Sequence, residues 1–192
     1  MGVAPAAGPR GDDRVRAFVA LPVSERLKTR LAELMRDLAP GAPGIRFVRP
    51  EGVHLTLRFL GSTSPEQLRV LEPRLRLAAA ACPGGEAHVS GLGLFPDRGS
   101  PHVLWIGLAL PESVRALQQA CEAAAVAAGM APEARPFHAH LTLGRWKDRA
   151  RRPDLPPADL GTQPIEELIL FRSELRAGGA LHTPLRRYRL GG

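Results

Sequence analysis

The tetrapeptide His-Leu-Thr-Leu occurs twice in this chain of 192 residues, at positions 54–57 and again at 140–143. A strand-like run followed by a helix start precedes each copy. The run begins at Phe18 for the first copy and at Trp105 for the second, 36 and 35 residues before the motif histidine. Such self-similarity is typical of two copies of one supersecondary unit. We therefore expect a duplicated fold in which the two motifs face each other across a pseudo-two-fold axis, in a central cleft.

Helical and strand-like segments alternate along the chain in an order that predicts the fold class. Ser24 and the pair Ser64-Pro65 are typical helix starts. Helices are expected over residues 24–38, 65–81 and 111–128, and strands over 14–21, 53–60, 87–94, 103–110, 138–146, 165–173 and 185–190. The proline-rich segment 149–164 predicts a loop on the surface or over the cleft. This order predicts a bilobal α+β fold with largely antiparallel sheets.

The bulk properties set limits on the setting and the partners. The length suits one bilobal domain over residues 14–190, with residues 1–13 as a disordered leader. A formal charge of +7 favours an anionic partner such as nucleic acid, although only two of the basic residues are lysines and a coding bias toward arginine explains the charge equally well. The longest apolar stretch is too short to span a bilayer. Cys82 and Cys121 show neither zinc-site nor disulfide spacing, so we expect a cytoplasmic setting. The two lobes complete a site within one chain, so we expect a monomer.

Each motif presents a histidine and a threonine on one face of a strand, because alternate residues of an extended chain share a face. Two imidazoles are suited to opening a cyclic phosphodiester. One takes a proton from attacking water and the other gives a proton to the departing oxygen, and an ordinary imidazole pKa of about 6.5 makes both states accessible. The threonine hydroxyls can donate hydrogen bonds to the non-bridging phosphate oxygens. A single His-x-Thr is more commonly structural, but two copies at matched positions favour a site that needs no metal or other cofactor.

With Arg58-Phe59-Leu60-Gly61 after the first motif and Gly144-Arg145 after the second, the pair of motifs resembles the 2H phosphoesterase superfamily. Within it, the chain is most similar to the RNA 2′,3′-cyclic phosphodiesterase family, also called 2′-5′ RNA ligase. The similarity extends over residues 14–190, through 46–50, 91–96, 103–105 and 178–185. It implies an enzyme that hydrolyses the terminal 2′,3′-cyclic phosphate of RNA to a 2′-phosphate, and that joins 2′-5′ linkages without ATP.

By motif position, the resemblance implies that His54 and His140 are the acid–base pair, that Thr56 and Thr142 bind the phosphate, and that Arg145 is a further phosphate contact. We assign His54 as the acid and His140 as the base, although the sequence does not decide between the two assignments.

The two arginines that follow the motifs differ in their predicted faces. Strict alternation places Arg58 on the face of the first histidine, where it could guide the phosphate backbone, but places Arg145 opposite the second histidine. The role implied for Arg145 therefore requires a β-bulge or a strand end, and Gly144 is well placed to permit one.

Phe47 and Phe171 are the candidates for stacking on an RNA base. Phe171 lies where members of the family often carry an aromatic residue, and core packing is the alternative for both. His138 shares a face with His140, and a His-x-His pair can bind zinc, but no third ligand at suitable spacing accompanies it, so no metal site is predicted.

Two other functions are compatible with the same residues. A phosphoesterase of a small cyclic-phosphate nucleotide would share the histidines and threonines, and would differ in having a closed pocket in place of an extended basic groove. An RNA-binding module without turnover would use the histidines only to hold phosphate, but it has no need for two titratable groups. The expected partner is RNA with a 2′,3′-cyclic phosphate end, with no membrane and no obligate protein partner.

Overall fold

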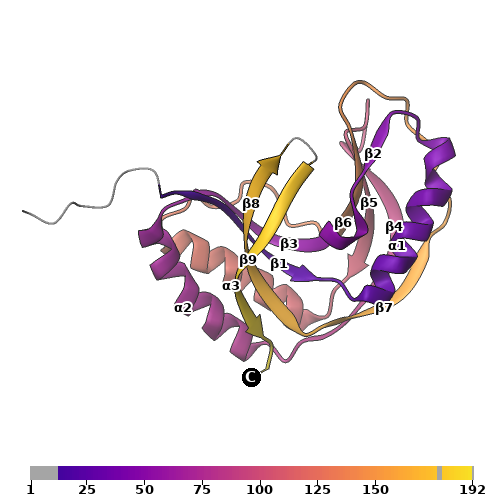
Figure 1. The fold of residues 1–192 in the computed structure, drawn as a ribbon. Helices are drawn as coiled ribbons and strands as arrows, with labels where there is room; N and C mark the ends of the chain where they lie inside the picture. Colours follow the sequence, from indigo (N-terminus) through magenta and orange to yellow (C-terminus); the bar gives the residue numbers. More distant parts are fainter. Residues whose placement is uncertain (1–12, 177–178, 192) are drawn as a thin grey trace, which may run out of the picture.

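The strands form one curled antiparallel sheet with helices packed on it (Figure 1). The computed structural model describes residues 13–176 and 179–191, so that most of the predicted leader, residues 1–12, lies outside the described residues. The strands are β1 (Val15–Pro22), β2 (Ile45–Phe47), β3 (His54–Thr63), β4 (Gly85–Phe95), β5 (Val103–Ala109), β6 (His140–Trp146), β7 (Asp159–Ile165), β8 (Glu167–Arg176) and β9 (Gly179–Arg189). The α-helices in this part of the chain are α1 (Glu25–Leu38), α2 (Pro65–Ala81) and α3 (Glu112–Ala127). The predicted α+β class with antiparallel pairing is confirmed.

The predicted duplication is visible in the order of the strands. The sheet runs β7-β4-β5-β6-β3-β1-β8-β9, with β2 paired to β6. The units β1-α1-β3 and β5-α3-β6 therefore lie on either side of a central β6–β3 junction. The strand pairing aligns Ala20 with Thr56 and Trp105 with Thr142. The position equivalent to Trp105 is thus Ala20, two residues after the Phe18 that sequence spacing suggests.

Serine side chains begin two of the helices as predicted. The hydroxyl of Ser24 accepts a hydrogen bond from the backbone N–H of Leu27 at the start of α1. At the start of α2, Ser64 and Gln67 satisfy each other's backbone N–H groups in a capping box, with Pro65 in the first turn. These caps fix where the helices begin, and so how their apolar faces meet the sheet.

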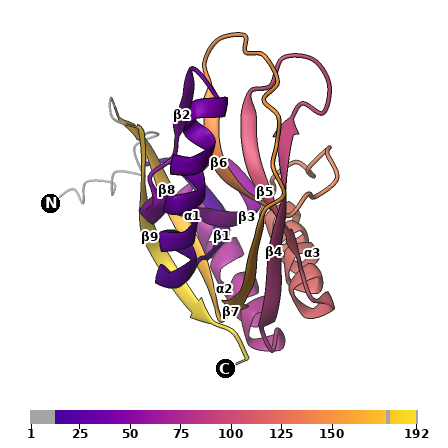
Figure 2. The same cartoon turned by 90° about the vertical axis from the view of Figure 1, so that its right-hand side faces the viewer.

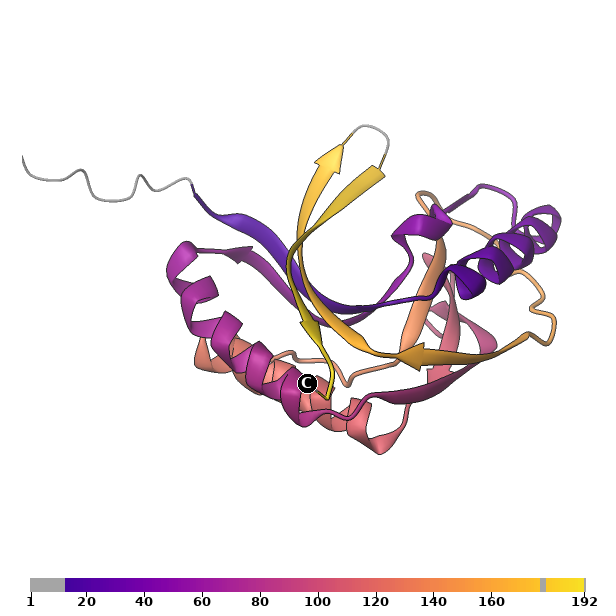
Figure 3. The same ribbon diagram turned by 60° about the horizontal axis from the view of Figure 1, so that its bottom comes forward.

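The helices cover one face of the sheet, and helices of each repeat unit also contact strands of the other half. Helix α3, from the second unit, contacts β3 of the first, and α1, from the first unit, contacts β7 of the second (Figure 2). Leucines of α1 and α2 share one continuous core with the motif leucines of β3 and β6. The hairpin of β8 and β9 extends to the side away from α2 and α3 (Figure 3). The core therefore ties both copies of the repeat together and leaves the other face of the central strands available for a site.

The prediction of a loop over residues 149–164 is wrong for its last part, residues 159–164. Residues 159–165 form β7, which pairs with β4 and has Pro164 opposite Glu86. Because β7 is at the edge of the sheet, its proline does not interrupt a ladder on both sides. Among the described residues no helix is both long enough and apolar enough to cross a membrane.

Candidate active site

The two motifs meet at the centre of the sheet. Leu55 of β3 and Leu141 of β6 form the pair that joins the two strands, and both are buried on the side covered by the helices. Alternation therefore places the histidine and threonine of each motif on the opposite side, which we call the site face. In an antiparallel pair of this register, the histidine of one motif lies opposite the threonine of the other. The four side chains thus surround the pseudo-two-fold axis, as the repeat predicts.

The two histidines are held in the same way. His54 Nδ1 lies 2.7 Å from the backbone oxygen of Gly52, and His140 Nδ1 lies 2.8 Å from the backbone oxygen of His138. A carbonyl oxygen only accepts, so the Nδ1–H of each ring is the donor. The Nε2 atom of each neutral ring is left with a lone pair, and this is the atom that can take a proton from a substrate and return one.

Burial lowers the pKa of His54 from 6.5 to about 4. The hydrogen bond to Gly52 opposes this effect, because it favours the charged ring, while the nearby His182 and His140 add to it when they carry charge. In the free protein His54 is therefore neutral at neutral pH. A bound anion beside the ring would favour its protonation.

Burial also lowers the pKa of His140. The hydrogen bond to the carbonyl of His138 raises it, and the charges of His138 and Arg145 lower it further. Arg145 therefore adds positive charge in the vicinity of His140. Neither histidine is charged at neutral pH before substrate arrives.

The hydroxyls of Thr56 and Thr142 are half-buried on the site face. Neither makes a hydrogen bond with another group within residues 13–176 and 179–191. A hydroxyl without an internal partner is free to donate to a ligand that lies over the axis.

A β-bulge occurs at the last residue of each motif. The register of β3 with β1 skips Leu57, and the register of β6 with β5 skips Leu143. Each bulge reverses the alternation, so that Arg145 is exposed on the site face. A Cβ atom on Gly144 would lie 2.7 Å from the Ile45 side chain, so any larger residue here would have to displace that side chain or β2 itself. The bulge that the sequence required for Arg145 is present.

The bulge on β3 has the opposite consequence for Arg58, and the predicted placement of this residue is wrong. Arg58 is turned to the helix side, where it is 7% exposed and forms ion pairs with Glu122 at 2.6 Å and Glu133 at 3.6 Å. Phe59 takes the site-face position equivalent to that of Arg145 and is 57% exposed. Alternation failed because nothing next to Arg58 signals a bulge as Gly144 does in the second copy.

Aromatic rings surround His54. Phe18 stacks on it with ring centroids 4.8 Å apart, and Phe171 stacks in turn on Phe18 at 5.1 Å. His182 meets His54 edge-on at 5.2 Å. The structure thus brings the predicted Phe171 to the site and adds Phe18, which sequence spacing alone had treated only as a landmark of the repeat.

A second aromatic cluster surrounds His140. Phe95 meets it edge-on at 5.1 Å, and Trp105 and His138 lie 6.2 Å and 6.0 Å away. Phe95 and Trp105 were not predicted as site residues. Trp105 comes from β5, which only the sheet order brings next to β6, and Phe95 comes from β4, one strand further away. No three His, Cys, Asp or Glu side chains of the described ranges are grouped so as to hold a metal ion.

Comparison with known proteins agrees with this geometry. The model of the LigT-like phosphoesterase family matches residues 21–105. The RNA 2′,3′-cyclic phosphodiesterase of Methanothermobacter thermautotrophicus is 31% identical over 92% of this chain and 100% of its own length. The RNA 2′,3′-cyclic phosphodiesterase of Thermus thermophilus is 34% identical over 93% of this chain and 91% of its own length. This chain belongs to the RNA 2′,3′-cyclic phosphodiesterase family of LigT-like phosphoesterases.

Solved structures of related proteins share its fold. A crystal structure of a protein from Thermus thermophilus superposes with a TM-score of 0.82 at 30% identity, covering 92% of this chain and 98% of that one. Escherichia coli LigT in its apo form gives a TM-score of 0.82 at 26% identity, covering 94% of this chain and 100% of LigT. Another structure of LigT contains 3′-AMP.

Two aromatic residues near the motifs of this family member do not reach the site face. Phe47 of β2 is opposite Gly144 and packs against the core, so it is not brought to the histidines. Trp146, which strict alternation along the strand would place on the face of His140, is buried, and its indole N–H donates to the backbone oxygen of Pro43. The bulge in β6 reverses the face of Trp146 just as it reverses that of Arg145.

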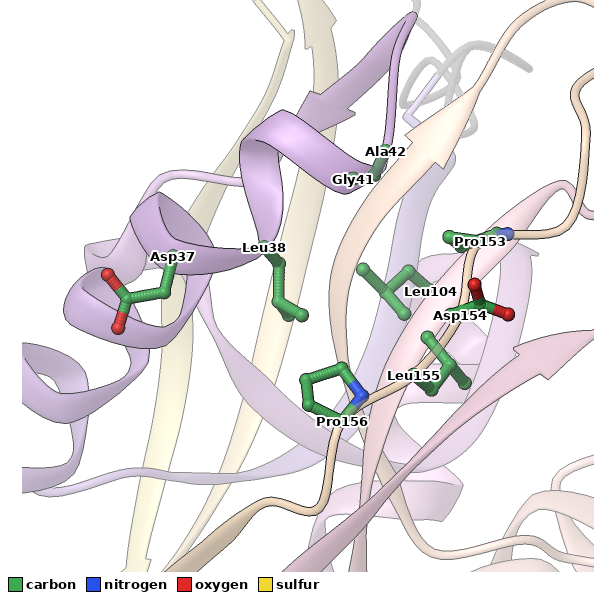
Figure 4. Close-up of a pocket in the computed structure, with 9 residues that line it drawn as sticks. All are labelled: Asp37, Leu38, Gly41, Ala42, Leu104, Pro153, Asp154, Leu155 and Pro156. Carbon is green, nitrogen blue, oxygen red and sulfur yellow. The ribbon is translucent and has the colours of Figure 1, made fainter.

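Residues 153–156, within the segment predicted as a loop, lie away from the histidines of this family member. Pro153 to Pro156 approach the end of α1 and line a cavity of about 110 Å³ with Asp37, Leu38 and Leu104 (Figure 4). Leu104 is fully buried on the helix side of the sheet. This cavity is therefore separate from the histidines, and none of the predicted site residues lines it.

Proposed function

We propose that this chain hydrolyses the terminal 2′,3′-cyclic phosphate of RNA to a 2′-phosphate by acid–base catalysis between His54 and His140. The observation that carries the proposal is the matched pair of imidazoles at the pseudo-two-fold axis, each oriented by a hydrogen bond from Nδ1 to a backbone oxygen. Related proteins that match more than nine-tenths of the chain are named RNA 2′,3′-cyclic phosphodiesterases, which supports the same substrate class.

In the proposed reaction His140 Nε2 takes a proton from water as the water oxygen attacks phosphorus. The bond from phosphorus to the 3′ oxygen breaks, and His54 Nε2 gives its proton to that oxygen, which leaves the phosphate on the 2′ oxygen. The hydroxyls of Thr56 and Thr142 donate to the non-bridging oxygens as negative charge develops on them. Arg145, on the same face, adds positive charge near the phosphate. These groups supply the chemistry without a metal ion.

The acid takes up its proton from solvent as the substrate binds. Both histidine pKa values are lowered in the free protein, so both rings are neutral at neutral pH. A cyclic phosphodiester is an anion, and an anion within a few ångströms raises the pKa of a neighbouring imidazole. Substrate binding therefore favours the singly protonated pair that the reaction requires.

The same groups can join two RNA ends. If the 5′-hydroxyl of a second RNA replaces water, its attack on phosphorus expels the same 3′ oxygen and gives a 2′-5′ linkage. No ATP is needed, because the energy is supplied by opening the cyclic phosphate. We propose this ligation as a second activity of the site, in which an RNA hydroxyl takes the place of water.

The proposal also includes the state of the protein. Both histidines come from one chain, so we propose that a monomer is active. Cys82 and Cys121 are free and buried, which is consistent with a reducing, cytoplasmic setting. Size-exclusion chromatography of the active fraction tests the monomer, and activity that elutes only with a dimer would contradict it.

The decisive experiment is incubation of the protein with a short RNA that ends in a 2′,3′-cyclic phosphate, in the presence of EDTA. A 2′-phosphate product, located by NMR, is expected. His54→Ala and His140→Ala should each lower turnover by roughly 10²- to 10⁴-fold, while the exposed His88→Ala is the matched control. A near-normal rate in either site variant would contradict the paired-histidine mechanism. Cleavage of cyclic mononucleotides only would favour the small-nucleotide function, and binding without turnover of either substrate would favour the binding module.

A further inference from the structure

Two arginines are directly opposed on neighbouring strands beside the site. Arg46 of β2 pairs with Arg145 of β6 in the antiparallel register. Directly opposed residues share a face, with their Cβ atoms about 5 Å apart, and like charges in such a pair destabilise the sheet. Both side chains are exposed. A pair of this kind is stabilised by an anion that lies between or above the two guanidinium groups.

No acidic side chain in the described part of the chain neutralises this pair. Other arginines do have carboxylate partners: Arg58, Arg69, Arg135, Arg172, Arg186 and Arg187. Neither Arg46 nor Arg145 forms an ion pair or a side-chain hydrogen bond with the described residues. Their positive charge is therefore available to a ligand.

The pair is next to the proposed reaction centre, not on a remote surface. The bulge in β6 puts Arg145 on the site face three residues after Thr142, and its charge acts on His140. Beyond Leu141, where β3 diverges, β2 takes its place beside β6. Arg46 is thus one strand further from the histidine pair than Arg145 is.

Gly144 fixes the distance between the two arginines. A Cβ atom at this position would meet the Ile45 side chain at 2.7 Å and the backbone oxygen of Arg46 at 3.1 Å. A residue with a side chain at this position would push against β2. The same glycine that permits the bulge also brings Arg46 alongside Arg145.

We propose that Arg46 binds the phosphodiester on the 5′ side of the terminal nucleotide, and so makes the enzyme prefer an RNA end over a cyclic mononucleotide. The inference rests on the proposed function, which places the terminal cyclic phosphate between the histidines. From there the chain of the RNA passes Arg145 and reaches Arg46, whose guanidinium suits a phosphate. A nucleoside 2′,3′-cyclic phosphate has no second phosphate and gains nothing from Arg46.

The test compares three substrates with the full-length protein: a nucleoside 2′,3′-cyclic phosphate, a dinucleotide with a 2′,3′-cyclic end, and the same dinucleotide with a neutral methylphosphonate linkage. Arg46→Gln should lower kcat/KM for the charged dinucleotide by roughly 10-fold, mainly through KM, as for one charge-assisted contact. The variant should have the wild-type kcat/KM for the nucleoside substrate. It should cleave the charged and the neutral dinucleotide at nearly the same rate. Arg46→Lys should recover part of the loss.

Salt provides a second readout that a purely structural role would not change. For the charged dinucleotide, the slope of log kcat/KM against log salt should decrease in magnitude by about 0.7 in Arg46→Gln, the value for one phosphate contact on a single strand. Arg36→Gln, at an exposed position of α1, removes the same charge elsewhere and is the matched control. It should behave as the wild type with all three substrates.

The outcomes separate this inference from the proposed function. If the wild type cleaves the cyclic substrates but Arg46→Gln affects the nucleoside and the dinucleotide equally, or affects neither, the inference is wrong while the function stands. If the wild type cleaves none of them, the proposed function fails, and the assignment of Arg46 fails with it.

Discussion

Replacing His54 with glutamine should remove a pH-dependent part of the folding stability. The pKa of His54 falls from 6.5 to about 4 in the folded protein because the ring is buried. As the pH falls below 6.5, the unfolded chain binds a proton at this position before the folded protein does, so acid favours unfolding. The contribution of His54 is therefore complete above pH 6.5, is lost as the pH falls toward 4, and does not change further below that.

The magnitude follows from the two pKa values. At about 1.4 kcal/mol per pH unit, the full effect is about 3 kcal/mol, of which about 2 kcal/mol is lost between pH 7 and pH 4.5. Glutamine does not titrate, so the His54→Gln variant should lose about 2 kcal/mol less than the wild type over this interval. Other histidines and carboxylates titrate in both proteins, and their contributions cancel in the comparison.

Urea unfolding at the two pH values, followed by tryptophan fluorescence, measures the difference. His88→Gln is the control, because His88 is exposed and lies outside the site, paired with Asp159. An NMR titration of the His54 ring gives its pKa directly. If the wild type and His54→Gln lose equal stability between pH 7 and pH 4.5, the ring is not held neutral by burial, and the argument that substrate binding drives its protonation is refuted.

The remaining predictions address the bulges and the acid–base pair. Arg58→Ala should lower the free energy of unfolding by about 3 kcal/mol, because it leaves a partly buried glutamate unpaired, whereas Arg145→Ala should lower activity with little change in urea stability; the reverse pattern would contradict the assigned faces. Gly144→Ala should cost about 1–3 kcal/mol in the same assay, because its methyl group overlaps the side chain beside it, and an unchanged stability would show that β2 can move away. The profile of kcat/KM against pH should be bell-shaped with its alkaline limb below pH 6.5, since both His54 and His140 have lowered pKa values in the free protein. The profile of kcat should lie at higher pH, because the bound anion raises both values, and coincident profiles would contradict this.

The motif residues could be assigned from sequence because their geometry is local and repeated. Alternation within a strand is enough to place His54 with Thr56 and His140 with Thr142, and the repeat is enough to predict that the two pairs meet. The helix starts were similarly accessible, because Ser24 and Ser64 cap through contacts with residues only three positions away. The bulge at Leu143 could be anticipated because a glycine follows it.

The faces of the residues after the motifs were decided by the register of neighbouring strands. The bulge at Leu57 has no local signal, and it exchanges the expected positions of Arg58 and Phe59. One shifted residue reverses every side chain beyond it, since the period of a strand is two. Errors of this kind are invisible to a pattern that assumes strict alternation.

The sequence by itself determined the duplicated α+β plan, the two histidine–threonine pairs and the class of chemistry, because each depends on residue type and short-range spacing. Tertiary structure alone decided what surrounds those pairs. Phe18, Phe95 and Trp105 reach the histidines across strand pairings that are far apart in the chain, and Arg46 reaches Arg145 in the same way. The depth of burial that lowers the pKa of His54 is likewise a property of the packed sheet, because no sequence neighbour can remove water from a ring.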